Sequence, residues 1–202
     1  MYQNYENDRQ EIINKLKALP FGNREFYADY LAQTYYYVRH SENFLALAAA
    51  LMGESDRKIQ RRFFTHLSEE SAHDLMVKKD IENLDFNIAN IKERPETKMF
   101  WESQYYKIEH VDPTALMGYI LFLEDVAAEV CLPMAQEVEK HYGKKCGTFL
   151  RVHGEEDPGH VADAFKVIDS LSEERRAIVR DNLEQSFIAY KNMINALLDS
   201  HK

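Results

Sequence analysis

Apolar residues recur with the period of an α-helix along nearly the whole chain, and few glycines or prolines interrupt them. The pattern predicts seven helices and no strand. They are expected at residues 9–19, 25–52, 57–84, 96–108, 113–142, 148–170 and 172–198. The sequence holds no internal repeat and no linker rich in Gly, Pro or Ser. We therefore predict an all-α fold in a single domain that spans residues 1–202.

Polar side chains interrupt the apolar stripe of the third predicted helix. The stripe, with steps of four and three residues, is Ile59, Phe63, His66, Glu70, His73 and Val77. Glu70 and His73 lie one turn apart, the usual spacing of two ligands that bind one metal ion. Glu69 lies one turn from both histidines and is a further candidate.

A single carboxylate interrupts the stripe of the helix that follows Pro113. This stripe is Leu116, Ile120, Glu124, Ala127, Cys131 and Met134. An unpaired buried carboxylate costs several kcal/mol, so Glu124 needs a cation, hydrogen bonds or a proton. It is a candidate metal ligand, and an ion pair with Arg39 or Lys166 is the structural alternative. Asp125, on another face of this helix, is expected at the surface.

The segment HGEEDPGH carries the most specific pattern. Its spacing places His153, Asp157 and His160 on one helical face. Pro158 and Gly159 stand between the last two and should kink or locally unwind the helix. Such a kink could redirect the candidate ligands.

Together these helices offer six candidate metal ligands, three imidazoles and three carboxylates. They are Glu70, His73, Glu124, His153, Asp157 and His160. Nitrogen and oxygen donors suit iron, manganese or zinc, and the lack of thiolates argues against a structural zinc site. Six ligands are too many for one ion with an open position and are suited to two. Each residue also has a structural interpretation as a hydrogen-bonded core side chain.

Three further residues are weaker candidates for the metal site. His66 lies one turn before Glu70, while His40 and Glu42 follow the run YYYVRHSENF in the second predicted helix. The alternative for this run is a buried central helix whose tyrosine hydroxyls are hydrogen-bonded within the core. Periodicity does not distinguish the two interpretations.

Composition and charge restrict the partners. The net charge of −9 disfavours nucleic-acid binding. The longest apolar run is 44–52, far short of the roughly 20 residues of a membrane span. The polar start of the sequence holds no apolar signal core, and two cysteines do not make a disulfide framework, so we expect a cytoplasmic protein.

In these motifs the chain resembles the haem-oxygenase-like metal-dependent oxidases, also called iron-containing redox enzymes or TenA/PqqC-like proteins. The resemblance covers roughly residues 26–168 and rests on YYYVRHS, HLSEESAHDLMVKKD, GYILFLEDVAAE and HGEEDPGH. It implies a bundle of about seven helices and a non-haem di-iron centre, with manganese as an alternative, that activates O2 to oxidise a small molecule. It also implies a homodimer. No haem is expected, because no histidine precedes His40.

One departure from the family pattern concerns the second ion. The family often supplies a further carboxylate from its first core helix, where this chain offers only His40 and Glu42. Two divalent ions beside three carboxylates leave one positive charge, which predicts an anionic substrate. Two other functions stay open: a metal-free hydrolase of the TenA type, with Cys131 as nucleophile, or a non-catalytic interaction protein on the same fold.

Overall fold

A computed structural model describes residues 2–202, apart from the side chains of residues 156 and 158. This part of the chain forms nine α-helices and no strand. The helices are α1 (Tyr5–Lys17), α2 (Arg24–Val38), α3 (Ser41–Leu51), α4 (Arg57–Glu69), α5 (His73–Asn83), α6 (Pro95–His110), α7 (Leu116–Tyr142), α8 (Thr148–Asp169) and α9 (Glu173–Asp199). Short 3-10 turns lie at Glu54–Asp56, Ile88–Asn90, Pro113–Ala115 and Lys144–Cys146. The all-α prediction is confirmed.

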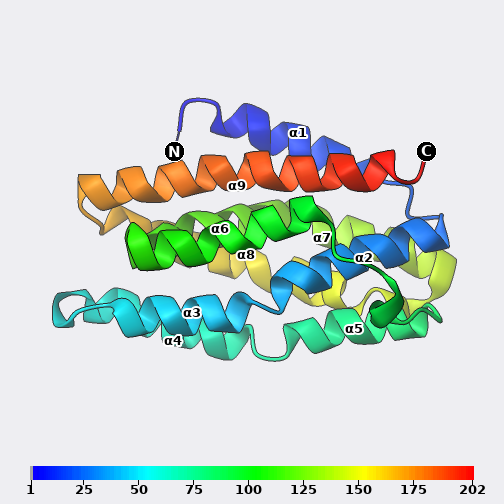
Figure 1. The fold of residues 1–202 in the computed structure, drawn as a ribbon, viewed down its shortest axis with the longest axis horizontal. Coiled ribbons are helices and arrows are strands. Elements are labelled where there is room, and N and C mark those ends of the chain that lie inside the picture. Colours follow the sequence, from blue (N-terminus) through cyan, green and yellow to red (C-terminus); the bar gives the residue numbers. More distant parts are fainter. Residues whose placement is uncertain (1) are drawn as a thin grey trace.

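The helices are arranged around α7, the longest buried element together with α9 (Figure 1). α7 packs against α8 on one side and α9 on another, and α1 lies across α7 and α9. α2 packs on α5, and α3 packs on α4. The candidate ligands lie on α4, α5, α7 and α8, where these layers meet.

Nine helices replace the predicted seven because two of the predicted helices are interrupted. The helix expected at residues 25–52 ends at Val38 and resumes at Ser41. The helix expected at residues 57–84 ends at Glu69 and resumes at His73. Ala72 has a φ of 66°, in the left-handed region that non-glycine residues rarely occupy. The prediction of one continuous helix through Glu70 and His73 was therefore wrong.

A carboxylate from α3 holds the second interruption. Glu42 Oε1 accepts a hydrogen bond of 3.0 Å from the backbone N–H of Ala72, the residue that caps the N-terminus of α5. A negative charge at this place is also favoured by the helix dipole. Glu42 therefore ties the start of α3 to the turn between α4 and α5.

Two glycines allow α7 to approach its neighbours closely. A Cβ at Gly118 would lie 2.3 Å from the carbonyl oxygen of Val179 in α9. A Cβ at Gly154 would lie 2.7 Å from the backbone nitrogen of Leu132, so only glycine allows this contact of α8 with α7. Gly154 follows His153 directly, and the contact brings α8 ligands close to α7.

Within residues 2–202, no helix combines the length and the apolar character that a membrane crossing requires.

Candidate metal centre

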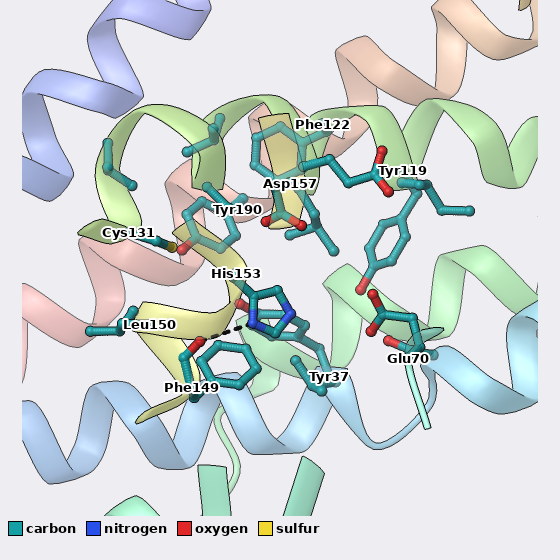
Figure 2. A pocket seen from close by; sticks show the side chains of 18 of the residues that line it. Tyr37, Glu70, Tyr119, Phe122, Cys131, Phe149, Leu150, His153, Asp157 and Tyr190 are labelled. Atoms are coloured by element: carbon teal, nitrogen blue, oxygen red, sulfur yellow. Dashed lines mark hydrogen bonds between the residues drawn. The ribbon is translucent and has the colours of Figure 1, made fainter. Parts of the chain in front are cut away.

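Two groups of potential ligands lie side by side where α4, α5 and α8 meet. Glu70, His73 and His153 form the first group, and His66, Glu69 and His160 form the second. Within each group the ligand atoms lie within 4.8 Å of one another, a separation that one ion can bridge after small side-chain adjustments. Figure 2 shows Glu70 and His153 facing one cavity from opposite elements.

Glu124 of α7 lies beside the second group. Its Oε1 is 3.4 Å from His66 Nε2 and 3.7 Å from His160 Nδ1. Glu70 Oε1 lies 3.7 Å from the same His66 nitrogen. Asp157 Oδ1 lies 3.5 Å from His160 Nδ1. The six residues of the predicted ligand set thus lie in one cluster, and His66 and Glu69 belong to it as well.

The Glu124 carboxylate lies beside the imidazoles of His66 and His160 but makes no hydrogen bond with any described residue. The residue is 4% exposed, and neither of its oxygens has a hydrogen-bond partner among the described residues. Burial above all, and the nearby Asp157 carboxylate, raise the pKa of Glu124 well above its usual range. Neither structural alternative for Glu124 is realised, because Arg39 pairs with Glu93 and Lys166 with Asp163. A bound cation would stabilise the charge of this carboxylate.

Protons compensate for part of the negative charge. The contact with Asp157, together with Glu124 and Glu69, raises the pKa of His160 to about 9 despite burial. Burial also raises the pKa of Asp157. Glu70 differs: burial opposes its ionisation, but the contact with His73 and the charges of His66 and His153 lower its pKa to about 2. A divalent cation would replace the protons on this cluster.

Hydrogen bonds orient two of the imidazoles. His153 Nδ1–H donates to the carbonyl oxygen of Phe149 over 3.0 Å, which leaves Nε2 as the metal-binding atom (Figure 2). His66 Nδ1 lies 3.2 Å from Glu69 Oε2, which also accepts from Arg62. Burial lowers the pKa of His66, which favours the neutral imidazole, the form that binds metal. The donor set therefore fits a site for two divalent ions.

The weaker candidates His40 and Glu42 lie outside the cluster. Glu42 holds Ala72 in the turn described above. His40 stacks on Trp101, with ring centroids 3.9 Å apart, and its Nδ1 lies 3.1 Å from the hydroxyl of Tyr105. The carboxylate missing from the first core helix is thus not replaced by either residue.

Two details of the ligand helices differ from the sequence-based expectations. α8 is one continuous helix from Thr148 to Asp169, so the local unwinding expected at Pro158 and Gly159 does not occur. Asp125, expected at the surface, is 9% exposed and accepts hydrogen bonds from Tyr5 and Arg9. It fixes α1 to α7 and takes no part in the cluster.

Glu69 and His66 belong to the same cluster as Glu70. Along the helix, Glu69 lies about 100° from Glu70. Both glutamates reach the cluster: Glu70 contacts His66 and His73, and Glu69 contacts His66 and His160. The spacing of Glu69 to both histidines was the one sequence signal for this residue.

A largely apolar cavity adjoins the cluster. The space that the centre of a water molecule can occupy in it is about 90 Å³. Glu70 and Tyr119 lie at one side of it, and Cys131 and Leu150 lie at the other (Figure 2). Its remaining wall is mostly aliphatic and aromatic, and Tyr30, Tyr37 and Tyr190 contribute hydroxyl groups. A small molecule bound here would lie beside the candidate ligands.

Comparison with known proteins identifies the family and the fold of the chain. Residues 28–190 match the family model described as "Iron-containing redox enzyme". The chain belongs to this family. It is also similar to the crystal structure of a domain of unknown function with a haem-oxygenase-like fold from Shewanella denitrificans. That similarity has a TM-score of 0.84 at 20% identity and covers 98% of this chain and 92% of the other.

A TenA homologue from Pseudomonas syringae pv. tomato is a second structural relative. Its TM-score is 0.77 at 12% identity, over 96% of this chain and 90% of that one. At these identities the two structures establish the haem-oxygenase-like fold alone. No curated protein sequence matches the chain significantly. The predicted family and fold are thus confirmed, while the ligand set stays a prediction.

Proposed function

We propose that this protein is an O2-dependent oxidase or oxygenase that holds two metal ions, iron in the first place or manganese, and oxidises a small molecule in the adjoining cavity. The observation that carries this proposal is Glu124: a buried carboxylate without a hydrogen-bond partner among the described residues, surrounded by imidazoles. Membership of the iron-containing redox enzyme family supports iron.

The two groups of ligands suggest how the ions are held. Glu70, His73 and His153 would bind the first ion, and His66, Glu69 and His160 the second. Glu124, from a separate helix, lies near His66 and His160 and would add a carboxylate to the second position. Asp157 lies close enough to His160 to complete the second position. When bound, the metal supplies the electrons that activate O2.

The protein's own residues orient the ligands and keep water out. The hydrogen bond from His153 to Phe149 fixes one imidazole, and Arg62 fixes Glu69. Glu70 is ionised throughout the physiological pH range because its pKa is about 2. The apolar wall of the cavity, which includes Leu45, excludes solvent from the place where substrate would react.

The charge of the substrate needs a new evaluation. The prediction of an anionic substrate counted three carboxylates, and Glu69 adds a fourth to the cluster. Four carboxylates balance the charge of two divalent ions, so charge alone no longer selects an anion. The cavity wall supports a small substrate with an apolar portion. A cytoplasmic location and a homodimer also remain predictions.

A metal-free hydrolase of the TenA type is the second candidate, because Cys131 lines the cavity and a TenA homologue shares the fold. A nucleophilic cysteine requires an environment that stabilises its thiolate. Burial, and to a lesser degree Asp157, instead raise the pKa of the Cys131 thiol. This observation favours the oxidase. A non-catalytic interaction protein on this fold would have no need of the Glu124 arrangement.

Anaerobic loading with iron(II), followed by elemental analysis and O2 uptake, tests the proposal. We expect two irons per chain and rapid O2 consumption in the wild-type protein. His153→Ala should lose iron, while His141→Ala, at an exposed histidine on α7, should bind as much as wild type. An iron-free wild-type protein would refute the metal centre. Loss of a hydrolytic activity in Cys131→Ser with no iron bound would support the second candidate.

A further inference from the structure

A row of aromatic side chains connects the metal centre with the break between α2 and α3. The hydroxyl of Tyr119 faces Glu70 (Figure 2) and has no hydrogen-bond partner among the described residues. The Tyr119 ring contacts Phe44 with centroids 5.8 Å apart, and Phe44 contacts Tyr105 at 4.7 Å. Tyr119 and Phe44 are buried, whereas Tyr105 is half-buried. The row therefore leads from the cluster toward solvent.

Tyr105 is paired with a base at the outer end of the row. Its hydroxyl lies 3.1 Å from His40 Nδ1, the only hydrogen-bonding contact of this imidazole among the described residues, since its Nε2 is buried without a partner. His40 is held by stacking on Trp101, whose Nε1–H donates to Glu93. Burial, and then the charge of Arg39, lower the pKa of His40 to about 4. The imidazole is thus neutral at pH 7; the lowered pKa makes it a weak base, but the radical cation of an oxidised phenol is acidic enough to give it a proton.

A phenol loses an electron far more readily when its proton can move to a base at the same moment. Tyr105 and His40 meet that requirement, because the Tyr105 hydroxyl contacts the imidazole. Phe44 cannot meet it, because it has no hydroxyl proton. The break that leaves His40 outside the helices α2 and α3 is what brings its ring to Tyr105. A purely structural role explains the stacking on Trp101 but gives no reason for a hydroxyl–imidazole contact in line with the metal ligands.

We propose that Tyr105, with His40 as its proton acceptor, is a redox-active tyrosine that exchanges electrons with the metal centre through Phe44 and Tyr119. This inference rests on the proposed function, which supplies the oxidant: a metal ion oxidised by O2. Tyr105 loses one electron, which reduces that ion by one unit, and its hydroxyl proton moves to His40 Nδ1. A one-electron reductant at the surface restores Tyr105, and His40 returns the proton.

The Tyr105–His40 pair would let the protein reduce an oxidised metal centre when no substrate occupies the cavity, or transfer electrons from a donor to the metal centre. Both uses require the same residues. Trp101 acts as a positioning residue, because it fixes the ring of His40.

Electron paramagnetic resonance of the iron-loaded protein, frozen shortly after mixing with O2, tests the proposal. We expect an organic radical that narrows when the protein contains ring-deuterated tyrosine and that is lost in Tyr105→Phe. Tyr106→Phe, the exposed neighbour on α6, is the matched control and should retain the radical. His40→Gln should shorten its lifetime. Bound iron and O2 uptake without a tyrosyl radical, or a radical that persists in Tyr105→Phe, would overturn the proposal.

A metal-free measurement separates this proposal from the proposed function. Flash-oxidised tris(bipyridine)ruthenium should oxidise the metal-free wild-type protein, at Tyr105, faster than it oxidises the metal-free Tyr105→Phe or His40→Gln variant. Deuterated water should slow the oxidation of the wild-type protein. Equal rates in all three proteins would refute the Tyr105–His40 pair even if iron binds. Absence of iron binding, with the rate difference intact, would instead refute the metal centre.

Discussion

Replacing Glu124 by glutamine should stabilise the metal-free protein and at the same time remove most of its response to metal. The carboxylate is buried, and neither of its oxygens has a hydrogen-bond partner among the described residues. Glutamine has nearly the same shape and carries no charge. The two effects have opposite signs, so they distinguish a ligand from an ordinary core residue.

The expected size follows from the environment. Burial and the nearby Asp157 raise the pKa of Glu124, so the folded state must either protonate this carboxyl or bear its charge, a cost that neutral glutamine does not have. We expect Glu124→Gln to gain on the order of 1 kcal/mol of unfolding free energy without metal, since one unit of pKa shift corresponds to about 1.4 kcal/mol. For a chain of this length each kcal/mol shifts Tm by about 2–4 °C. Metal at a hundred times its Kd should raise wild-type stability by about 2.7 kcal/mol, an increase that the variant should largely lack.

Thermal unfolding of both proteins at pH 7, with and without iron(II) under argon, measures the two effects. Glu129→Gln is the matched control, because Glu129 lies on the same helix, is exposed and pairs with Lys17. We expect the wild-type and variant Tm values to exchange their order when metal is added. A variant that is less stable than wild type without metal, yet stabilised equally by metal, would refute the role of Glu124.

Three further changes test the supports of the site. Gly154→Ala should lower stability by about 1–3 kcal/mol through overpacking against α7 and should weaken iron binding; chemical denaturation and iron titration measure both, and unchanged values would contradict the close contact. Glu42→Ala should cost about 0.5–1.5 kcal/mol and reduce iron affinity by freeing Ala72, while Glu42→Gln, which retains the acceptor, should restore both. Burial raises the pKa of Asp80 to about 6, so the folded state favours its neutral form and stability falls as pH rises from about 4 to 6. Asp80→Asn should lose this term and gain on the order of 2 kcal/mol relative to wild type between those pH values, as unfolding curves across that range would show; a constant difference would contradict it.

Helical periodicity was sufficient to predict the all-α fold, the order of the helices and most of their ends. It failed at two places, residues 39–40 and 70–72, where α2 and α4 end. Neither place contains Gly or Pro, and the apolar stripe continues across the second. The left-handed conformation of Ala72 is held by Glu42, 30 residues earlier. Local sequence cannot report a conformation that a distant side chain maintains.

The candidate site could be predicted where its ligands share a regular helix. His153, Asp157 and His160 lie on α8 as their spacing indicated, and Glu124 interrupts the stripe of α7. Glu69 was underestimated, because it lies about 100° from Glu70 along the helix. His40 was only a weaker candidate ligand. Periodicity cannot distinguish a metal ligand from a residue that lies outside the ligand cluster among aromatic side chains. The structure places it beside Trp101 and Tyr105.

The two sides of the cluster are held in different ways, and the difference suits redox chemistry. α7 and α8 are locked together at Gly154, where the backbones meet too closely for any side chain, so Glu124 and the α8 ligands have little freedom. Glu69 and Glu70 lie at the end of α4, next to the left-handed turn at Ala72, where the hydrogen bond from Glu42 is exposed. With metal bound as proposed, carboxylates at a helix end would change their binding mode more easily than ligands on a packed helix when the charge of the ion changes. The interruption of the helix at Glu69 therefore provides adaptable ligands opposite a rigid set.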